Sequence, residues 1–327
     1  MSSAAIRKAF VLGAGLGKRL RPLTTSLPKP LIPIYQKPLI TFAFDHLIAS
    51  GITDLMVNTH HCAEAYGALF PHSEGTFSYR GATVTLRNEP VLLETGGGIK
   101  NIEDWVQEEP FLVYNGDILT DVSIQDLIFH HREGGNAATL LLRSKGGPLH
   151  VQWDSETGEV VDIGRKIGAN YEGTGFLFSG VYILEPMIFS RLKAGEITSI
   201  IPIFLEMIRR GGKVGGFLQD EGMWFDLGTR EAYLEVHREL ARRNFQFSYS
   251  VPQPWPVRIA ESAKVANDIS LEGVVVIGEG SHVAAGAKLQ DTIVWENAEI
   301  ASGSALNGCI VTSGQSVEGY FTEKDFG

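Results

Sequence analysis

A glycine-rich segment near the amino terminus combines an unobstructed backbone with several positive charges. Residues 13–24 read Gly-Ala-Gly-Leu-Gly-Lys-Arg-Leu-Arg-Pro-Leu-Thr, and Pro28-Lys29-Pro30 follows. Glycines let backbone N–H groups approach phosphate oxygens. Arginine binds phosphate through paired hydrogen bonds, whereas lysine acts as a point charge. The segment is therefore expected to surround a polyphosphate with the charges of Lys18, Arg19, Arg21 and Lys29.

The spacing argues against two other phosphate-binding motifs. The glycines do not follow the G-x-G-x-x-G pattern, and Asn58-Thr59 stands where a dinucleotide site would carry an acidic residue. Lys18 is followed by arginine, whereas a P-loop lysine is followed by Ser or Thr.

Two aspartates are candidate ligands for a metal ion. Asp117 ends the run Asn115-Gly116-Asp117 after an apolar segment, and Asp226 lies within Trp224-Phe225-Asp226-Leu227-Gly228-Thr229. Mg²⁺ is commonly held by one or two carboxylates together with substrate phosphates. Either aspartate alone would more often be solvated or would cap a helix. Asp121, just before Ser123, is expected to be such a cap, and the adjacent His60 and His61 are expected to be solvated.

A second glycine-rich run, Leu93-Glu94-Thr95-Gly96-Gly97-Gly98, lies between an expected strand and an expected helix. It can be the start of that helix, but each glycine costs about 1 kcal/mol relative to alanine in a helix. Close approach of the backbone to a ligand is the interpretation that we favour. Glu94 would then accept a hydrogen bond from a base or a sugar hydroxyl, or serve only as a cap.

The elements that must position these residues alternate between strand and helix. Short apolar runs at residues 9–12, 55–57, 83–86, 111–114 and 138–142 are typical of buried parallel strands. Between them, one helix is expected to open at Pro38 and end before Gly51, and another to carry Ile99, Ile102 and Val106. This alternation predicts a doubly wound, Rossmann-like α/β sheet, with its ligand site beyond the carboxyl ends of the strands.

The last quarter of the chain follows a different period. Aliphatic residues stand six apart from Ile259 to Leu289, and after two single-residue slips the pattern continues to Val317. This period predicts a short left-handed parallel β-helix of hexapeptide repeats, with about three repeats per coil and no more than about three coils. The expected domains are a catalytic domain over 1–247, a proline-rich linker over 248–257 and the β-helix over 258–320.

Composition narrows the function classes. The chain has 327 residues and a formal net charge of −10, with no cluster of lysines or arginines outside the glycine loop, so binding of nucleic acid through a basic face is not expected. The only two cysteines, Cys62 and Cys309, cannot form a disulfide framework or a four-ligand zinc site. No apolar run reaches the length of a membrane helix. These features predict a soluble, cytoplasmic protein without a membrane partner.

The combination of the 13–24 loop with Pro28-Lys29-Pro30 resembles the nucleotidyltransferase family that makes NDP-sugars. The resemblance covers essentially the whole chain and implies Mg²⁺ as cofactor, with an NTP and a sugar 1-phosphate as substrates. It implies Arg19 and Lys29 as catalytic residues and Asp117 and Asp226 as metal ligands. The implied nucleotide-binding residues are Gly13, Ala14, Gly15, Gly17, Lys18, Glu94, Thr95, Gly96 and Gly97.

The resemblance also implies a sugar-binding wall. Its expected members are Asn115, Gly116, Thr174, Ser179 and Gly180. Where relatives often carry Glu-Lys-Pro, this chain reads Ile163-Gly164-Arg165-Lys166-Ile167-Gly168, so Arg165 or Lys166 would replace the usual lysine on the sugar phosphate.

The substrate pair stays open at this point. The Leu-Glu-Thr-Gly-Gly-Gly run is most like uridylyltransferases acting on N-acetylmuramate 1-phosphate, whereas the tail is more like mannose-1-phosphate guanylyltransferases, toward which we lean. A catalytically silent regulatory subunit is the first rival, although Arg19, Lys29, Asp117 and Asp226 are all present. An acyltransferase in the tail is the second. Since His282 is the only histidine in the repeats, we instead expect the tail to serve packing or homo-oligomerisation.

Overall fold

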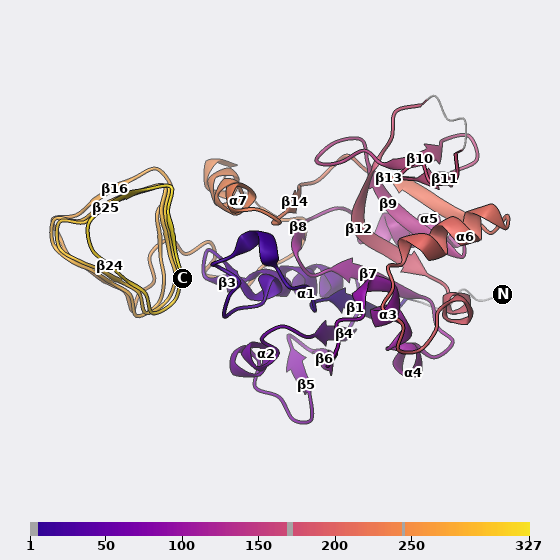
Figure 1. Ribbon diagram of the computed structural model, residues 1–327, viewed down its shortest axis with the longest axis horizontal. Helices are drawn as coiled ribbons and strands as arrows, with labels where there is room; N and C mark the ends of the chain where they lie inside the picture. Colours follow the sequence, from indigo (N-terminus) through magenta and orange to yellow (C-terminus); the bar gives the residue numbers. More distant parts are fainter. Residues whose placement is uncertain (1–5, 169–172, 244–245) are drawn as a thin grey trace. The chain divides into compact units, whose positions relative to one another are not determined.

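The computed structural model describes residues 6–168, 173–243 and 246–327 (Figure 1). The chain forms two compact units. The first, here called the sheet unit, consists of Met1–Gly15 and Phe42–Phe225; the second, the β-helix unit, consists of Leu16–Thr41 and Asp226–Gly327. This division differs from the expected boundaries, because the segment with Lys18, Arg19 and Lys29 belongs with the carboxyl-terminal coils.

The sheet unit is built on one ten-stranded mixed sheet, with strands in the order β10-β11-β13-β9-β12-β7-β1-β4-β6-β5. Its strands are β1 (Lys8–Leu12), β4 (Asp54–Thr59), β5 (Thr76–Tyr79), β6 (Ala82–Asn88), β7 (Phe111–Asn115), β9 (Ala138–Arg143), β10 (Val151–Asp154), β11 (Glu159–Ile163), β12 (Leu177–Leu184) and β13 (Val214–Leu218). Strands β7, β1, β4 and β6 run parallel to one another, as the alternating pattern predicts. The predicted Rossmann-like α/β class is confirmed.

The helices are α1 (Leu39–Ala49), α2 (Glu64–Leu69), α3 (Glu94–Lys100), α4 (Glu103–Val106), α5 (Ile124–Gly134), α6 (Ile201–Arg209) and α7 (Arg230–Arg243), with 3-10 turns η1 (Lys18–Leu20), η2 (Lys29–Leu31) and η3 (Pro186–Arg191). The single helix expected around Ile99 to Val106 is wrong: the chain forms α3 and α4 instead. Similarly, α1 begins at Leu39, because Pro38 lies in the short strand β3 (Lys37–Pro38), which pairs with β2 (Pro33–Ile34).

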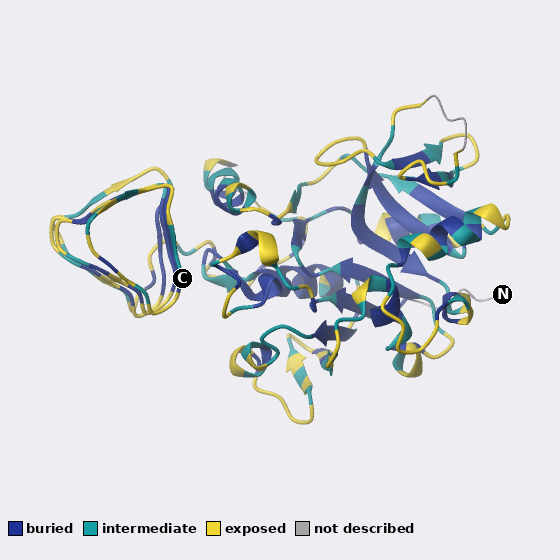
Figure 2. Ribbon diagram, viewed as in Figure 1, coloured by how far each residue is buried: buried dark blue, intermediate teal, exposed yellow. Residues whose placement is uncertain are grey.

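The core of the sheet unit is apolar and continuous. Phe10, Val113 and Leu140 are fully buried on three strands of the sheet. The rings of Tyr182 and Phe204 contact edge to face, with centroids 5.9 Å apart, which joins β12 to α6. Figure 2 shows the middle strands in the colour of buried residues and the outer loops as exposed. This packing fixes the strand ends, where the candidate polar residues stand.

The expectation for Asp121 is wrong. Ser123 caps α5, since its hydroxyl oxygen accepts a hydrogen bond from the N–H of Asp126 at 3.2 Å. Asp121 Oδ1 instead accepts the N–H of Met223 at 2.6 Å. The backbone in this region forms the small pair of β8 (Ile118–Thr120) and β14 (Trp224–Asp226). Asp121 thus lies close in sequence to the start of α5, but its hydrogen-bond partner, Met223, lies far along the chain.

The carboxyl-terminal tail is a parallel β-helix, drawn end-on as a triangle in Figure 1. One side is β15 (Lys264–Val265), β18 (His282–Val283), β21 (Glu299–Ile300) and β24 (Ser316–Val317). The second is β16 (Ser270–Glu272), β19 (Lys288–Gln290), β22 (Ala305–Asn307) and β25 (Tyr320–Thr322). The third is β17 (Val276–Ile277), β20 (Ile293–Val294), β23 (Ile310–Val311) and β26 (Asp325–Phe326).

The expected limit of about three coils is wrong, because each side of the β-helix has four strands and the last ends at Phe326 rather than near residue 320. The register explains the two slips: Val283 pairs with Ile300, and Ile300 with Val317, so each of these coils is one residue shorter than three full repeats. Burial of Ile277, Leu289 and Leu306 in the interior confirms the aliphatic period from Ile277 onward, whereas Ile259 and Leu271 of the same pattern are exposed.

The segment Leu16–Thr41 is fastened to the rest of the β-helix unit by buried hydrogen bonds. Tyr35 O–H donates to the carbonyl of His237 at 2.6 Å, and Trp255 Nε1–H donates to the carbonyl of Ile34 at 3.2 Å. Gln36 Nε2–H donates to the carbonyls of Val257 and Ile277. These contacts explain why an amino-terminal segment belongs to the same compact unit as the coils.

None of the helices in the described parts of the chain has both the length and the apolar character needed to cross a lipid bilayer. Cys62 and Cys309 are both thiols, in agreement with the expectation that they form no disulfide framework.

Candidate functional site

The carboxyl ends of neighbouring parallel strands bring two of the predicted loops together within the sheet unit. Leu12 at the end of β1 pairs with Asn115 at the end of β7. Gly116 N–H then donates to the carbonyl of Leu12 at 3.0 Å. A Cβ on Gly116 would stand 2.7 Å from that oxygen, so this position requires glycine. Gly13 and Asp117 consequently leave the sheet at one shared edge, as expected for ligand sites in such folds.

A buried hydrogen-bond network holds the first residue of the glycine loop. Gly13 N–H donates to Asn58 Oδ1 at 2.7 Å, and Asn58 Nδ2–H donates to Glu89 Oε1 at 2.9 Å. Glu89 Oε2 accepts the N–H of Leu93 at 3.1 Å, and the side chain of Glu89 is buried. Tyr66 O–H donates to the carbonyl of Gly13 at 3.1 Å. Both backbone groups of Gly13 are therefore engaged within the protein.

Sequence reasoning missed this network. Asn58 is the second-last residue of β4 and follows its apolar run, and Glu89 directly follows the last residue of β6. That was the available signal: polar side chains at strand ends of a buried sheet need partners, because burying an unpaired polar group costs free energy.

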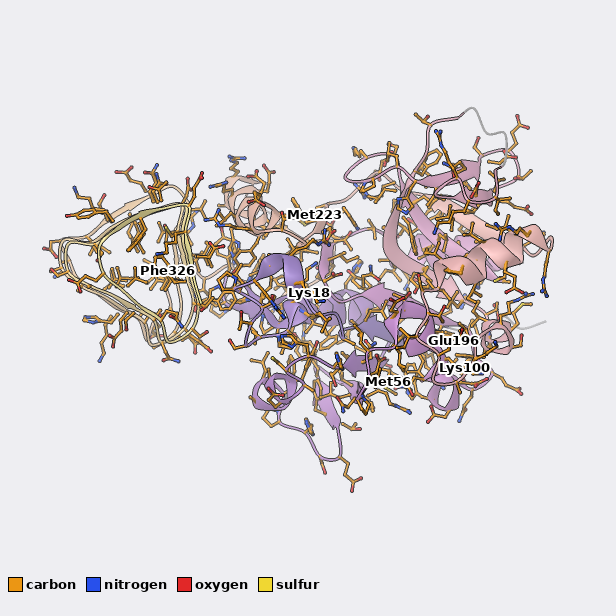
Figure 3. The ribbon with its side chains drawn as sticks, viewed as in Figure 1. Lys18, Met56, Lys100, Glu196, Met223 and Phe326 are labelled. Atoms are coloured by element: carbon orange, nitrogen blue, oxygen red, sulfur yellow. The ribbon has the colours of Figure 1, made fainter. Side chains whose placement is uncertain are left out.

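The remaining loop residues are more open. Ala14 is buried, whereas Gly15 is exposed and a Cβ built on it would meet no atom within 4 Å. Gly17 has a φ of +58°, which favours glycine, and its carbonyl accepts the hydroxyl of Thr24 at 2.8 Å. Lys18 and Arg19 on η1 are exposed (Lys18 is labelled in Figure 3). Among the predicted glycines of this loop, Gly15 is thus the one with room for a ligand.

The second glycine run packs against another segment of the chain. Gly96 and Gly97 lie within α3, and both of their N–H groups donate to the carbonyl of Thr198, at 2.7 and 3.1 Å. A Cβ on Gly97 would stand 2.3 Å from the carbonyl oxygen of Glu196, and one on Gly96 2.9 Å from that of Thr198. These glycines therefore admit the close approach of the chain's own backbone at residues 196–199.

The two polar residues of this run differ in their surroundings. Thr95 Oγ1 accepts the N–H of Ile200 at 2.9 Å, so this side chain also supports the packing of α3. Glu94 is exposed and has a φ of +59°. Within the described residues of this run, Glu94 is the fully exposed polar residue, and Thr95 is intermediate in exposure.

The predicted sugar-binding residues fall into a packed group and an exposed group. A Cβ on Gly180, whose φ is +85°, would stand 2.5 Å from Asn115 Nδ2, so these two residues are in close contact. Ser179 is buried, and its hydroxyl oxygen accepts the N–H of Val181 at 3.2 Å. Thr174 is exposed. Trp224 Nε1–H donates to the carbonyl of Ser179 at 2.8 Å, which holds this part of β12.

Arg165 and Lys166 lie on a loop that is organised by a buried carboxylate. Asp162 is buried, and its oxygens accept the N–H groups of Ile163, Lys166, Ile167 and Gly168 at 2.7–3.1 Å. The side chains of Arg165 and Lys166 are both exposed. Asp162 is another positioning group that the sequence did not single out.

The β-helix unit gathers three of the predicted catalytic and metal-binding residues. Lys29 Nζ lies 3.2 Å from Asp226 Oδ1; the lysine side chain is 8% exposed and the aspartate side chain 46%. A Cβ on Gly228 would stand 3.0 Å from Arg19 Nη2 and 3.1 Å from Asp226 Oδ1, which places the guanidinium of Arg19 beside this backbone. Leu20, Leu23 and Leu31 are buried and fix the segment that carries the two cations.

The carboxylates present suit magnesium. Mg²⁺ takes oxygen ligands and typically binds one or two carboxylates while substrate phosphates and water fill its other positions. Asp226 offers a half-exposed carboxylate, and Asp117 is intermediate in exposure at the sheet edge. Among the described residues, no three His, Cys, Asp or Glu side chains form a cluster that would hold a metal by themselves, which applies to His60 and His61 as well.

A buried histidine fastens the Leu16–Thr41 segment to α7. His237 Nδ1–H donates to the carbonyl of Tyr233 at 2.8 Å, so its Nε2 is the acceptor for Tyr35 N–H at 3.3 Å. Burial lowers the pKa of His237 to about 4, because the charged form would lose its hydration. Burial likewise raises the pKa of Tyr35 to about 12. The neutral imidazole is therefore the form that fits this position.

The family-model comparison matches residues 8–243 to the description "Nucleotidyl transferase". The chain belongs to this family. The chain is 27% identical to a mannose-1-phosphate guanylyltransferase of Mycobacterium tuberculosis over 91% of this chain and 82% of the relative. It is 32% identical to an N-acetylmuramate alpha-1-phosphate uridylyltransferase of Neisseria meningitidis over 68% of this chain and 93% of the relative.

The fold comparison agrees. A solved structure from Bacillus anthracis, described as a putative glucose-1-phosphate thymidylyltransferase in complex with a sucrose, superposes with a TM-score of 0.60. It is 23% identical and covers 74% of this chain and 97% of that chain, so it supports the fold alone. The nucleotidyltransferase class, and with it an enzymatic role, is thereby confirmed for this chain.

Proposed function

We propose that this protein joins an NTP to a sugar 1-phosphate, releasing pyrophosphate and forming an NDP-sugar, with guanylyl transfer to mannose 1-phosphate as the preferred pair. The observation that carries the proposal is the gathering of Arg19, Lys29 and Asp226 in the β-helix unit. These residues combine phosphate-binding cations with an oxygen ligand for a metal, which is what transfer between phosphates requires.

The chemistry needs few catalytic groups. A phosphate oxygen of the sugar 1-phosphate attacks the α-phosphorus, and the bond from that phosphorus to the bridging oxygen of the departing pyrophosphate breaks. Because the second pKa of a phosphate monoester is about 6, the nucleophile is largely ionised near neutral pH and needs no general base. The protein's task is to hold the two reactants in line and to neutralise the developing charge.

We assign the roles as follows. Arg19 binds the pyrophosphate portion of the NTP, and Lys29 neutralises charge at the α-phosphate, where its nearly buried position strengthens the interaction. Gly15 and Lys18 contact the triphosphate, and Glu94 is the candidate for base recognition. Asp117 and Asp226 are the proposed ligands for Mg²⁺, which when bound screens the phosphate charges.

For the sugar we retain Asn115, Gly116, Thr174, Ser179, Gly180 and Arg165 as the proposed wall, with Lys166 as the alternative to Arg165. The exposure of Arg165 and Lys166 on the loop around Asp162 supports a role in binding an incoming phosphate. The thiols at Cys62 and Cys309 suit the reducing cytoplasm, which is our proposed location. Self-association through the coils remains a second role for the tail.

The competing substrate pair is UTP with N-acetylmuramate 1-phosphate, which is favoured by the 32% identity to such an enzyme over 68% of this chain. The mannose-1-phosphate relative matches 91% of the chain and therefore also includes much of the coiled tail. We prefer the guanylyl assignment because that similarity extends over more of the chain.

The test is release of pyrophosphate in the presence of Mg²⁺, with four NTPs crossed against mannose, glucose, N-acetylglucosamine and N-acetylmuramate 1-phosphates. We expect one pair to dominate and Asp117→Ala to abolish its turnover. UTP with N-acetylmuramate 1-phosphate as the best pair would replace our preferred substrates. No release by folded protein from any pair would reject catalysis and support a regulatory subunit.

A further inference from the structure

The helix that follows Asp226 is anchored in the last coil of the β-helix. Arg230 is the first residue of α7, and its Nε–H donates to Asp325 Oδ1 at 2.7 Å. Arg230 Nη2–H also donates to the carbonyl of Gly308. The side chains of Arg230 and Asp325 are only 20% and 11% exposed, so the ion pair is largely shielded from solvent.

The last coil also supports the loop that carries Arg19. A Cβ on Gly327 would stand 3.0 Å from Pro22 Cβ and 3.2 Å from the carbonyl oxygen of Pro22. The final residue of the chain therefore packs against the backbone directly after η1. Phe326, labelled in Figure 3, belongs to this same coil, and its ring contacts that of Phe321 with centroids 5.0 Å apart.

A third connection reaches the segment after Lys29. Trp295 Nε1–H donates to the hydroxyl of Tyr233 at 3.0 Å, and Tyr233 O–H donates to the carbonyl of Pro33 at 2.7 Å. Trp295 belongs to the coils and Tyr233 to α7, so the route runs from the β-helix through α7 to the backbone just past η2. Tyr233 and Trp295 are both buried, so these hydrogen bonds are shielded from water.

These three connections converge on the segments that carry Arg19, Lys29 and Asp226. We propose that the Arg230–Asp325 pair is a positioning device for these residues, so that the last coil of the β-helix is required for efficient nucleotidyl transfer. Arg230 acts through the backbone of 226–230 and does not itself touch substrate. The inference rests on the proposed function and adds to it a role for the tail in each single chain.

A matched ion pair provides the control. Arg238, further along α7, lies 3.8 Å from Asp291 in the coils, so it also joins the helix to the β-helix, but away from Asp226. The variants are Arg230→Met, Arg230→Lys, Asp325→Asn and Arg238→Met. Each is assayed at a temperature where circular dichroism shows it to be folded, and kcat is separated from KM for the NTP.

Displacing catalytic groups by about 1 Å can cost on the order of 100-fold, so we expect kcat to fall about 10- to 100-fold in Arg230→Met and Asp325→Asn. KM should change little. Arg230→Lys should recover part of the loss, because lysine keeps the charge opposite Asp325. Arg238→Met should keep the wild-type kcat. Equal kcat values for the Arg230→Met and Arg238→Met variants would overturn the proposal, since an ion pair that only stabilises the fold would behave in that way.

A second measurement does not depend on activity. Hydrogen–deuterium exchange of peptides covering residues 16–31 should accelerate in Arg230→Met and stay at the wild-type rate in Arg238→Met. Unchanged exchange in both variants would overturn the coupling. If the wild-type protein transfers no nucleotide to any sugar phosphate, the proposed function fails, while the exchange comparison still decides whether the last coil holds the loop.

Discussion

The two glycine-rich segments, residues 13–17 and 96–98, look alike in sequence but serve different purposes. In the first, Gly15 faces open space and is followed by exposed Lys18 and Arg19. In the second, the N–H groups of Gly96 and Gly97 are bonded to Thr198, and both Cα atoms lie against the backbone of 196–199. Glycine in one place leaves room for a ligand, and in the other it leaves room for a neighbouring segment.

This contrast shows that a run of glycines indicates a need for space but not whether a ligand or another segment fills it. The charged residues nearby in the sequence help to distinguish the two cases. Exposed Lys18 and Arg19 directly follow the first segment in the sequence and Lys29 comes soon after, whereas the exposed residue just before the second segment is Glu94. An anionic ligand is therefore expected at the first segment, and substitutions in the two should separate loss of activity from loss of stability.

The largest effect should come from Lys29, a cation that follows the first segment in the sequence. Replacing Lys29 by Met removes a nearly buried charge next to Asp226. We expect kcat to fall about 100- to 1,000-fold, the usual cost of removing one group that stabilises transition-state charge. Lys100→Met is the control in α3, where the lysine pairs with Glu103 at 2.6 Å, and steady-state kinetics should show a kcat near wild type. Similar losses of kcat in Lys29→Met and Lys100→Met would show that Lys29 has no special role in catalysis.

Gly97→Ala should mainly reduce stability. The added Cβ would stand 2.3 Å from the carbonyl oxygen of Glu196, and backbone at that distance cannot yield cheaply. We expect a loss of about 3 kcal/mol in the free energy of unfolding, the upper end of the cost of overpacking, measured by urea denaturation. If Gly97→Ala keeps wild-type stability and loses only nucleotide affinity, the second segment binds the ligand after all.

Gly15→Ala should instead affect nucleotide binding and leave stability nearly unchanged. Its Cβ meets nothing within 4 Å, so the free energy of unfolding should change by less than about 1 kcal/mol. The KM for the NTP should rise about tenfold, equivalent to one hydrogen bond to a charged group of about 1.5 kcal/mol. An unchanged KM, measured beside the Gly97→Ala variant, would show that the open glycine is not a contact point.

The attachment of the Leu16–Thr41 segment to α7 should depend on pH. Burial lowers the pKa of His237 from its usual 6.5 to about 4, so the unfolded chain binds a proton that the folded chain excludes. The contribution of neutral His237 to the free energy of unfolding is complete above about pH 6.5. It is lost as the pH falls toward 4, at roughly 1.4 kcal/mol per pH unit. Burial also lowers the pKa of His46, in the sheet unit, to about 4. His46 should therefore add a similar pH dependence to the free energy of unfolding.

His237→Gln should reduce the slope of the free energy of unfolding against pH by the amount that one histidine contributes. The slope is measured by urea unfolding between pH 7 and pH 5. His282→Gln is the matched control, because His282 is exposed on β18. An identical slope in the two variants would show that His237 does not bind a proton upon unfolding.

Much of the fold follows from local patterns. The strand runs at 9–12 and 111–114 place Gly13 and Asp117 at one sheet edge, because parallel strands of a crossover fold end on the same side. The period of six in the tail directs Ile277, Leu289 and Leu306 inward, since one aliphatic per repeat must face the interior of a coil. The cations between Lys18 and Lys29 were also recognisable from composition and spacing alone.

Hydrogen-bond and ion-pair partners that lie far apart in the chain could not be predicted from local sequence patterns. Lys29 and Asp226 are separated by 197 positions, and Asn58 and Glu89 by 31, so no periodicity links them. Asp121 was assigned to the nearby helix start, yet it bonds to Met223. Local patterns decide which face of an element is buried, whereas the choice of a partner depends on how whole elements pack. Packing alone settled that the amino-terminal loop rests on the last coil, because only long-range burial brings Pro22 against Gly327.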